Sequence, residues 1–156
     1  MKITLIQTGK TRFNYLQEGI SDYQKRLSHY INFEELTLPD LKDKKNLSIE
    51  EIKVQEGTQL LKRFTPSDFV ILLDKNGKSF SSMELANYLQ KRIISGRNIV
   101  LVIGGAYGFS QEVYNRANEK ISLSKMTFSH QLVRLILVEQ LYRAMTIIKG
   151  EPYHHE

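Results

Sequence analysis

Two continuous apolar runs constrain the fold of this chain more than any other feature of its sequence. They are FVILLD at Phe69–Asp74 and NIVLVI at Asn98–Ile103, and neither alternates between apolar and polar residues as a strand with one wet face does. Strands with this pattern are buried on both faces, which is typical of parallel sheets covered by helices on each side. A shorter run, KITLIQT at Lys2–Thr8, predicts a third strand.

The segments between these runs have helical spacing and helix start signals. Ser48-x-x-Glu51 and Ser81-x-x-Glu84 are capping boxes, and they predict helices that end near Phe64 and Ser95. The alternation of strands and helices predicts a single α/β domain over residues 1–156, with a mainly parallel sheet flanked by helices. The remaining predicted elements are helices over Arg12–Tyr30, after Ser110 and over His130–Lys149, strands at Asn32–Leu38 and Ile121–Leu123, a loop at Leu41–Asn46 and a turn at Asp74–Gly77.

The composition excludes several classes of protein. The 156 residues contain no cysteine, so a disulfide framework, a thiol nucleophile and a cysteine metal site are excluded. No apolar run is long enough for a membrane span, and the first residues lead into a strand rather than a signal peptide. We therefore expect a soluble, cytoplasmic protein without a membrane partner.

The positive charge of the chain is unevenly distributed. The formal net charge is +5, and residues 120–150 carry five basic side chains against one acid, whereas residues 34–56 carry seven acids against four lysines. A second basic stretch runs from Lys75 to Arg97. This distribution is expected of a protein that binds a phosphate backbone, but a solvated basic surface without a partner accounts for it equally well.

Two fragments end like a phosphate-binding loop but lack its first glycine. They are Gly9-Lys10-Thr11 and Gly77-Lys78-Ser79, and the position five residues before each of these glycines holds Thr4 or Leu72. No G-x-G-x-x-G motif follows the first strand either. An ATP or NAD site is therefore not predicted.

Glycines and an apolar loop mark a candidate ligand site. Gly104-Gly105-x-x-Gly108 directly follows a buried strand, where glycines let the backbone approach a ligand, although a tight turn into the next helix also explains them. Leu72-Leu73-Asp74 ends the neighbouring run in the same way. The loop Leu123–Phe128 carries Leu, Met and Phe side chains, which either wrap a flat apolar ring such as adenine or pack into the core.

The helix predicted over His130–Lys149 is apolar around nearly its whole circumference. A sheet covers only one face of a helix, so we infer a second buried face, most simply a homodimer interface. Glu139 and Arg143 are spaced as an ion pair within one helix. Arg134 and Arg143 are otherwise candidates for phosphate contacts.

The chain ends in Pro152-Tyr153-His154-His155-Glu156. Chain ends are ordinarily frayed, but an aromatic ring, two imidazoles and a carboxylate can stack on a base and move a proton. A metal site built from His130, His154 and His155 is not predicted, because the sequence has neither the helical His-x-x-x-His spacing nor paired carboxylates to support it.

Four stretches of the chain together resemble one protein family. They are LLDxxGK at Leu72–Lys78, IGGAYG at Ile103–Gly108, LSKMTFSHQLVR at Leu123–Arg134 and EQLYRAMTIIKGEPYHHE at Glu139–Glu156. Over its full length the chain is similar to the ribosomal RNA large subunit methyltransferase H family, the smallest of the SPOUT methyltransferases. The chain departs from the family pattern at Ser129, where proline is usual, and we expect this serine to loosen the turn into the last helix.

The resemblance implies a trefoil-knotted α/β fold in which S-adenosylmethionine is held bent in the knot between two subunits of a homodimer. It implies methylation of N3 of a pseudouridine in helix 69 of 23S rRNA on the assembled ribosome, without a metal and without a DNA partner. Arg143, Tyr153 and His154 would lie at the RNA-facing mouth. The cofactor would contact Leu73, Gly104, Leu123, Ser124, Lys125, Met126, Thr127 and Phe128.

Methyl transfer from a sulfonium requires in-line positioning and the loss of the N3 proton. His154 and Glu156 are candidates to accept this proton, and Arg143 would stabilise the resulting anion or hold a phosphate. A mechanism without a dedicated base is equally open. The alternative function is a non-catalytic homodimer that binds RNA or the ribosome and docks through its basic C-terminal segment.

Overall fold

A computed structural model of the chain describes residues 1–155, in which strands and helices alternate. All strand pairs are parallel, in the order β2-β1-β4-β3-β5, so the predicted α/β fold with a parallel sheet is confirmed. The strands are β1 (Ile3–Thr8), β2 (Phe33–Leu38), β3 (Phe69–Ser79), β4 (Ile99–Ile103) and β5 (Glu119–Ser122). The helices are α1 (Asn14–Leu27), η1 (Lys44–Asn46, a 3₁₀ helix), α2 (Ile49–Leu61), α3 (Ser82–Ile94), α4 (Gln111–Arg116) and α5 (Leu132–Lys149).

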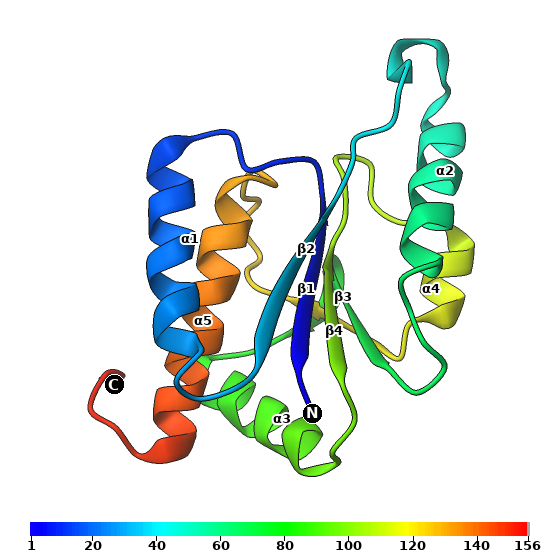
Figure 1. The fold of residues 1–156 in the computed structure, drawn as a ribbon. Helices are drawn as coiled ribbons and strands as arrows, with labels where there is room; N and C mark the ends of the chain where they lie inside the picture. The colour runs from blue at the N-terminus through cyan, green and yellow to red at the C-terminus, as the bar shows by residue number, and fades with distance from the viewer. Residues whose placement is uncertain (156) are drawn as a thin grey trace.

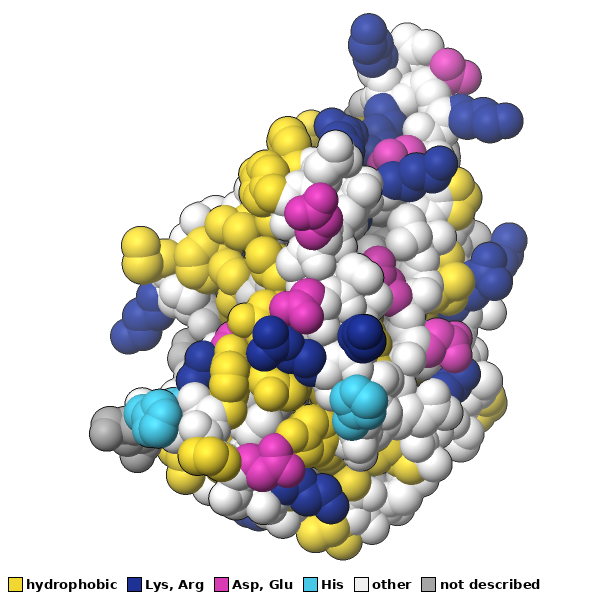
Figure 2. All heavy atoms as spheres, turned by 60° about the vertical axis from the view of Figure 1, so that its left-hand side comes forward, with side chains coloured by type: hydrophobic (Ala, Val, Ile, Leu, Met, Phe, Trp, Pro, Cys, Tyr) yellow, Lys and Arg dark blue, Asp and Glu magenta, His cyan; other side chains and the backbone are white. Residues whose placement is uncertain are grey.

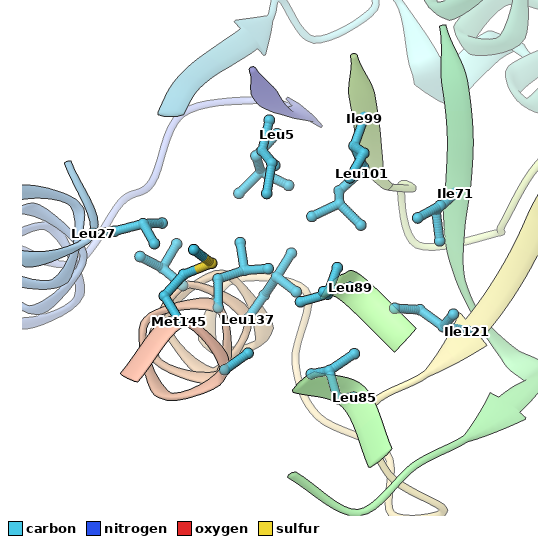
Figure 3. Packing of buried hydrophobic residues seen from close by; sticks show 14 of the residues in the cluster. Leu5, Leu27, Ile71, Leu85, Leu89, Ile99, Leu101, Ile121, Leu137 and Met145 are labelled. Atoms are coloured by element: carbon cyan, nitrogen blue, oxygen red, sulfur yellow. The ribbon is translucent and has the colours of Figure 1, made fainter. Parts of the chain in front are cut away.

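Helices cover both faces of the sheet, as strands buried on both faces require (Figure 1). Helices α1, α3 and α5 pack on one face, and α2 and α4 lie on the other. Along β4, Ile99, Leu101 and Ile103 belong to the first core cluster, whereas Val100 and Val102 belong to the second. Figure 3 shows the first cluster, in which side chains from the sheet and from the three helices fill the space between the two layers.

Hydroxyl side chains begin three of the helices as the sequence predicts. Ser48, Ser81 and Ser110 each accept a hydrogen bond from a backbone N–H in the first turn of α2, α3 and α4. At Ser81 the capping box is complete, because the Glu84 carboxylate also accepts a hydrogen bond from the backbone N–H of Ser81 at 2.7 Å. These bonds satisfy donors that have no partner within the helix.

The turn predicted at Asp74–Gly77 does not end β3. The strand continues to Ser79, and Ile121 of β5 pairs with both Leu73 and Lys78. The residues between these two partners therefore form an irregularity inside the strand, where the backbone N–H of Asn76 donates to the Asp74 carboxylate at 2.8 Å. The turn residues Asp74–Gly77 thus coincide with the irregularity in the strand. They could not predict that the strand continues, because that depends on pairing with β5, which lies more than 40 positions later in the sequence.

Helix α5 lies between α1 and α3 and against the sheet (Figure 1). The sheet and the two neighbouring helices therefore bury much of its apolar circumference within one subunit, which leaves a smaller apolar face for the inferred partner than the sequence indicated. The homodimer itself stays a prediction, as does the knot. Within residues 1–155, no helix has the length and apolarity needed to cross a membrane.

Candidate active site

The carboxyl ends of β3 and β4 and the loop after β5 enclose a cavity of about 500 Å³. Parallel strands end at the same edge of a sheet, which is why segments far apart in the sequence meet there. All eight residues that the resemblance assigns to the cofactor line this cavity. They are Leu73, Gly104, Leu123, Ser124, Lys125, Met126, Thr127 and Phe128.

The glycine turn after β4 lines the cavity and also packs closely against the side chains of Phe109 and Glu56. A Cβ atom on Gly104 would come 2.9 Å from the ring of Phe109, and one on Gly105 would come 2.5 Å from Oε2 of Glu56. Neither position therefore has room for a side chain without movement of its neighbours. The turn is needed for packing and also lines the cavity, so the two explanations of the glycine motif are compatible.

Two side-chain hydrogen bonds order the loop after β5. The hydroxyl of Ser122 donates to the carbonyl of Ser124 at 2.9 Å, and the hydroxyl of Ser124 accepts from the backbone N–H of Met126 at 3.0 Å. The Met126 residue is 74% exposed, whereas Leu123 packs partly against the core. The apolar loop therefore splits between its two predicted roles, with Leu123 partly in the core and Met126 free to cover a ligand.

Besides the residues assigned to the cofactor, polar side chains that include Asp74, Tyr114 and His130 line the cavity. The hydroxyl of Tyr114 donates to the Asp74 carboxylate, and burial together with this bond raises the pKa of Tyr114 to about 12. The pKa of His130 is lowered mainly by its partial burial and to a lesser extent by the positive charges of Arg134 and Arg12. The sequence marked Asp74 by its place at the end of a buried run, whereas no local pattern marked Tyr114 or His130 as part of this cavity.

Three predicted site residues, Arg143 of α5 and Tyr153 and His154 of the tail, form a second cluster together with Glu139, which we call the tail cluster. Arg143 donates to Oε1 of Glu139 from Nη2 at 2.6 Å and from Nε at 3.0 Å, so the predicted ion pair within α5 is present. The Tyr153 hydroxyl donates to the same oxygen at 3.1 Å. Nη1 of Arg143 lies 3.1 Å from Nδ1 of His154. Glu156, the fourth candidate, lies outside the described residues.

The tail is docked rather than frayed up to this cluster. The ring of Tyr153 meets that of Tyr142 edge-on, with centroids 4.7 Å apart, and its hydroxyl lies 3.2 Å from the hydroxyl of Tyr23 in α1. Burial, the contact with Tyr23 and the charge of Glu139 raise the pKa of Tyr153. This phenol therefore stays protonated near neutral pH, and it can orient a neighbour but cannot act as a base there.

The cavity and the tail cluster lie toward opposite ends of α5. Val133 at the start of the helix lines the cavity, and Arg143 follows ten positions later, which corresponds to roughly 15 Å along a helix. The tail beyond Lys149 extends from the far end of α5, away from the strand ends (Figure 1). Within one subunit, the two groups of predicted site residues are therefore not brought together.

Arg134 is a structural residue, so its assignment as a candidate phosphate contact was wrong. It is 1% exposed, and its guanidinium donates to the carbonyls of Thr8 and Gly9, each at 2.8 Å, and to the hydroxyl of Thr11 at 3.0 Å. It thereby ties the first turn of α5 to the loop after β1. Ser129 supports the same helix start, because its hydroxyl accepts from the backbone N–H of Leu132 at 3.1 Å, a bond that proline cannot make.

Comparisons with known proteins show the family of the chain. A sequence profile described as "Predicted SPOUT methyltransferase" matches residues 1–154. The chain is 54% identical, over 100% of both chains, to the protein of Parabacteroides distasonis named Ribosomal RNA large subunit methyltransferase H. It is 56% identical to the protein of that name from Christiangramia forsetii, over 99% of both.

A solved structure shares the fold. The crystal structure of tRNA (m1G37) methyltransferase from Aquifex aeolicus matches with a TM-score of 0.58 at 15% identity, over 100% of this chain and 76% of that one. At this level of identity the likeness concerns the fold alone.

Proposed function

The chain belongs to the SPOUT methyltransferase family, and on this premise we propose that it is an S-adenosylmethionine-dependent rRNA methyltransferase. Its proposed target is N3 of a pseudouridine in helix 69 of 23S rRNA, methylated on the assembled ribosome in the cytoplasm. The observation that carries the proposal is the single cavity in which all eight predicted cofactor residues meet. The net positive charge of the chain and the names of the full-length relatives support an RNA of the large ribosomal subunit as substrate.

The cavity is suited to S-adenosylmethionine in size and chemistry. Its volume of about 500 Å³ lies within the range of roughly 300–1,000 Å³ that small-ligand sites occupy. Leu123, Met126 and Phe128 offer apolar contacts to an adenine ring, and the backbone of the surrounding loops offers donors and acceptors to its edge. The Asp74 carboxylate adds a negative charge beside a ligand that carries positive charge.

The residues of the tail cluster are suited to position the acceptor base. When bound, S-adenosylmethionine supplies an electrophilic methyl group, so the chain has to hold the N3 atom in line and help its proton to leave. The cation of Arg143, held by Glu139, would lower the pKa of a nearby N3 and stabilise the anion. Tyr153 would orient this cation, whose guanidinium carbon lies 4.7 Å from the centre of its ring.

The distance between the two groups of residues supports a homodimer in which one subunit's tail completes the cavity of the other. The face formed by α1 and α5 offers a surface for such pairing, because hydrophobic side chains gather on it (Figure 2). Phe13, Tyr15 and Leu132 are exposed at the ends of these helices nearest the cavity. Two copies placed antiparallel along this face would bring each tail toward the partner's strand ends.

The deciding experiment is mass-spectrometric mapping of 23S rRNA from a strain that lacks the gene. We expect the methyl group on the helix 69 pseudouridine to disappear, and purified protein with S-adenosylmethionine to restore it on isolated ribosomes. An unchanged methylation pattern in the deletion strain would remove the proposed substrate.

Titration calorimetry with S-adenosylmethionine separates the enzyme from a non-catalytic RNA-binding homodimer. The enzyme requires saturable cofactor binding that a Thr127→Trp change in the cavity removes. A folded protein that binds ribosomes but gives no heat with S-adenosylmethionine would favour the non-catalytic alternative.

A further inference from the structure

A groove of about 570 Å³ runs along the outer edge of the sheet, between α3 and the paired strands β3 and β5. Its lining combines the basic side chains of Lys78, Lys91, Arg92 and Lys120 with the rings of Phe80 and Tyr88. Three of these four cations come from the second basic stretch of the sequence, and none was assigned to the cofactor or to the tail cluster. Lys78 ends the LLDxxGK motif.

The two acids of the groove are already engaged. Glu119 accepts hydrogen bonds from Arg92 and from the hydroxyl of Tyr88. Glu84 is bound to the backbone N–H of Ser81 at the start of α3. Within residues 1–155, Lys78, Lys91 and Lys120 take part in none of the ion pairs. The groove therefore presents three exposed ammonium groups to solvent against the single carboxylate of Glu84, and its lining carries a net charge of +2.

The groove and the cofactor cavity lie on either side of a third hollow of the surface. This depression of about 260 Å³ shares Phe80 with the groove and Leu123, Ser124 and Phe128 with the cavity. A chain of linked monomers with one unit at the cavity mouth could extend along this depression into the groove. A small acceptor molecule would leave the groove empty.

We propose that this groove binds the phosphodiester backbone of the substrate rRNA beside the nucleotide that is methylated. The proposal rests on the proposed function, and it assigns to Lys78, Lys91 and Lys120 the phosphate contacts that hold the RNA in register. Ammonium groups bind phosphates as point charges and carry no sequence information, so these lysines position the RNA without selecting the base. The rings of Phe80 and Tyr88 offer apolar surface to the sugars and bases between the phosphates.

The test compares the wild-type protein with the variant Lys78→Ala/Lys91→Ala/Lys120→Ala. Its matched control is Lys42→Ala/Lys45→Ala/Lys62→Ala, which removes the same charge from exposed lysines around η1 and α2, with no ion pair within residues 1–155. Binding is measured by co-sedimentation with unmethylated ribosomes at salt concentrations from about 50 to about 200 mM. Methyl transfer to the same ribosomes and calorimetric binding of S-adenosylmethionine are measured alongside.

We expect the groove variant to bind ribosomes about tenfold or more weakly at about 150 mM salt. The slope of log Kd against log salt should become shallower by about 0.7–0.9 for each phosphate that the variant no longer binds. The KM for ribosomes should rise with little change in kcat, and the affinity for S-adenosylmethionine should stay the same. The control variant should behave like the wild type.

An unchanged Kd and salt slope in the groove variant would overturn the proposal. So would an equal loss in the control variant, because the effect would then follow net charge rather than the groove. If the wild type binds ribosomes but transfers no methyl group, the proposed function fails, and the binding measurements still decide whether the groove holds RNA.

Discussion

Nη1 of Arg143 lies 3.1 Å from Nδ1 of His154. A guanidinium can only donate hydrogen bonds, so Nδ1 of His154 acts as the acceptor, and the neutral ring carries its proton on Nε2. In this arrangement Arg143 occupies Nδ1, the nitrogen of the neutral ring that accepts hydrogen bonds. We therefore predict that His154 orients the acceptor base, because Arg143 must move before Nδ1 can accept the N3 proton.

The His154→Ala variant should lose methyl transfer and keep cofactor binding. We expect a fall of roughly 10²–10⁴-fold in the single-turnover rate, the usual size of a lost positioning or proton-transfer group, with an unchanged Kd for S-adenosylmethionine. The neighbouring His155→Ala variant is the control, because His155 is exposed. Deleting Tyr153–Glu156 should resemble His154→Ala, and a single-turnover rate equal to that of the full-length protein would exclude a catalytic tail.

The Tyr23→Phe variant should loosen the tail. It removes the hydroxyl that lies 3.2 Å from the hydroxyl of Tyr153 and keeps the ring. We expect a loss of about 0.5–1.5 kcal/mol in the free energy of unfolding, typical of one hydrogen bond, and a lower kcat with an unchanged cofactor Kd. An unchanged kcat in Tyr23→Phe would show that the hydroxyl pair does not position the tail.

The Arg134→Leu variant should be strongly destabilised. Leucine fills part of the space but leaves the carbonyls of Thr8 and Gly9 and the hydroxyl of Thr11 without their donor. Each unsatisfied buried group costs about 1–3 kcal/mol, so we expect a loss of about 3 kcal/mol or more in urea unfolding. The exposed Arg63→Leu change should stay within about 0.5 kcal/mol of the wild type. A small loss in Arg134→Leu would mean that water replaces the guanidinium in this loop.

The contrast between β4 and Arg134 shows what the sequence could and could not predict. Ile99–Ile103 is apolar on both faces, so its burial in the middle of a parallel sheet follows from the run itself. Arg134 is a charged residue on a helix, and such residues usually face solvent. Its burial depends on the carbonyls of Thr8 and Gly9, more than 120 positions earlier, and no local pattern reveals that pairing.

The candidate site divides in the same way. Strand ends and glycines located the cavity, because parallel strands bring their carboxyl ends together wherever they lie in the sequence. The separation of the tail from that cavity depends on the direction of α5 across the sheet, which the periodicity of the helix does not encode. The aromatic contacts of Tyr153 with Tyr23 and Tyr142 likewise arise only when α1 packs beside α5.

The stability of the protein should depend on pH through Glu56. This side chain is 7% exposed under the glycine turn, and burial raises its pKa, with Asp40 acting in the same direction and Lys44 in the opposite one. A carboxyl group whose pKa is higher in the folded state contributes stability at low pH that is lost as the pH rises through the folded pKa. Glu56→Gln should therefore be more stable than the wild type near pH 7, and this gain should shrink as the pH falls to about 4. Urea unfolding across this range tests the prediction against Glu18→Gln, since Glu18 is exposed and lies in the middle of α1. A gain that is independent of pH in Glu56→Gln would contradict the prediction.

Mixed dimers test whether the cavity and the tail of one site come from different subunits. Thr127→Trp blocks the cavity from an exposed loop position, and His154→Ala disables the tail, so each variant alone should be inactive. In a dimer of one subunit of each kind, the intact cavity of the His154→Ala subunit faces the intact tail of its partner. Random mixing makes about half of the dimers mixed, each with one working site of two, so about a quarter of the wild-type rate should return. If each subunit instead used its own tail, no dimer would hold a complete site and the mixture would stay inactive.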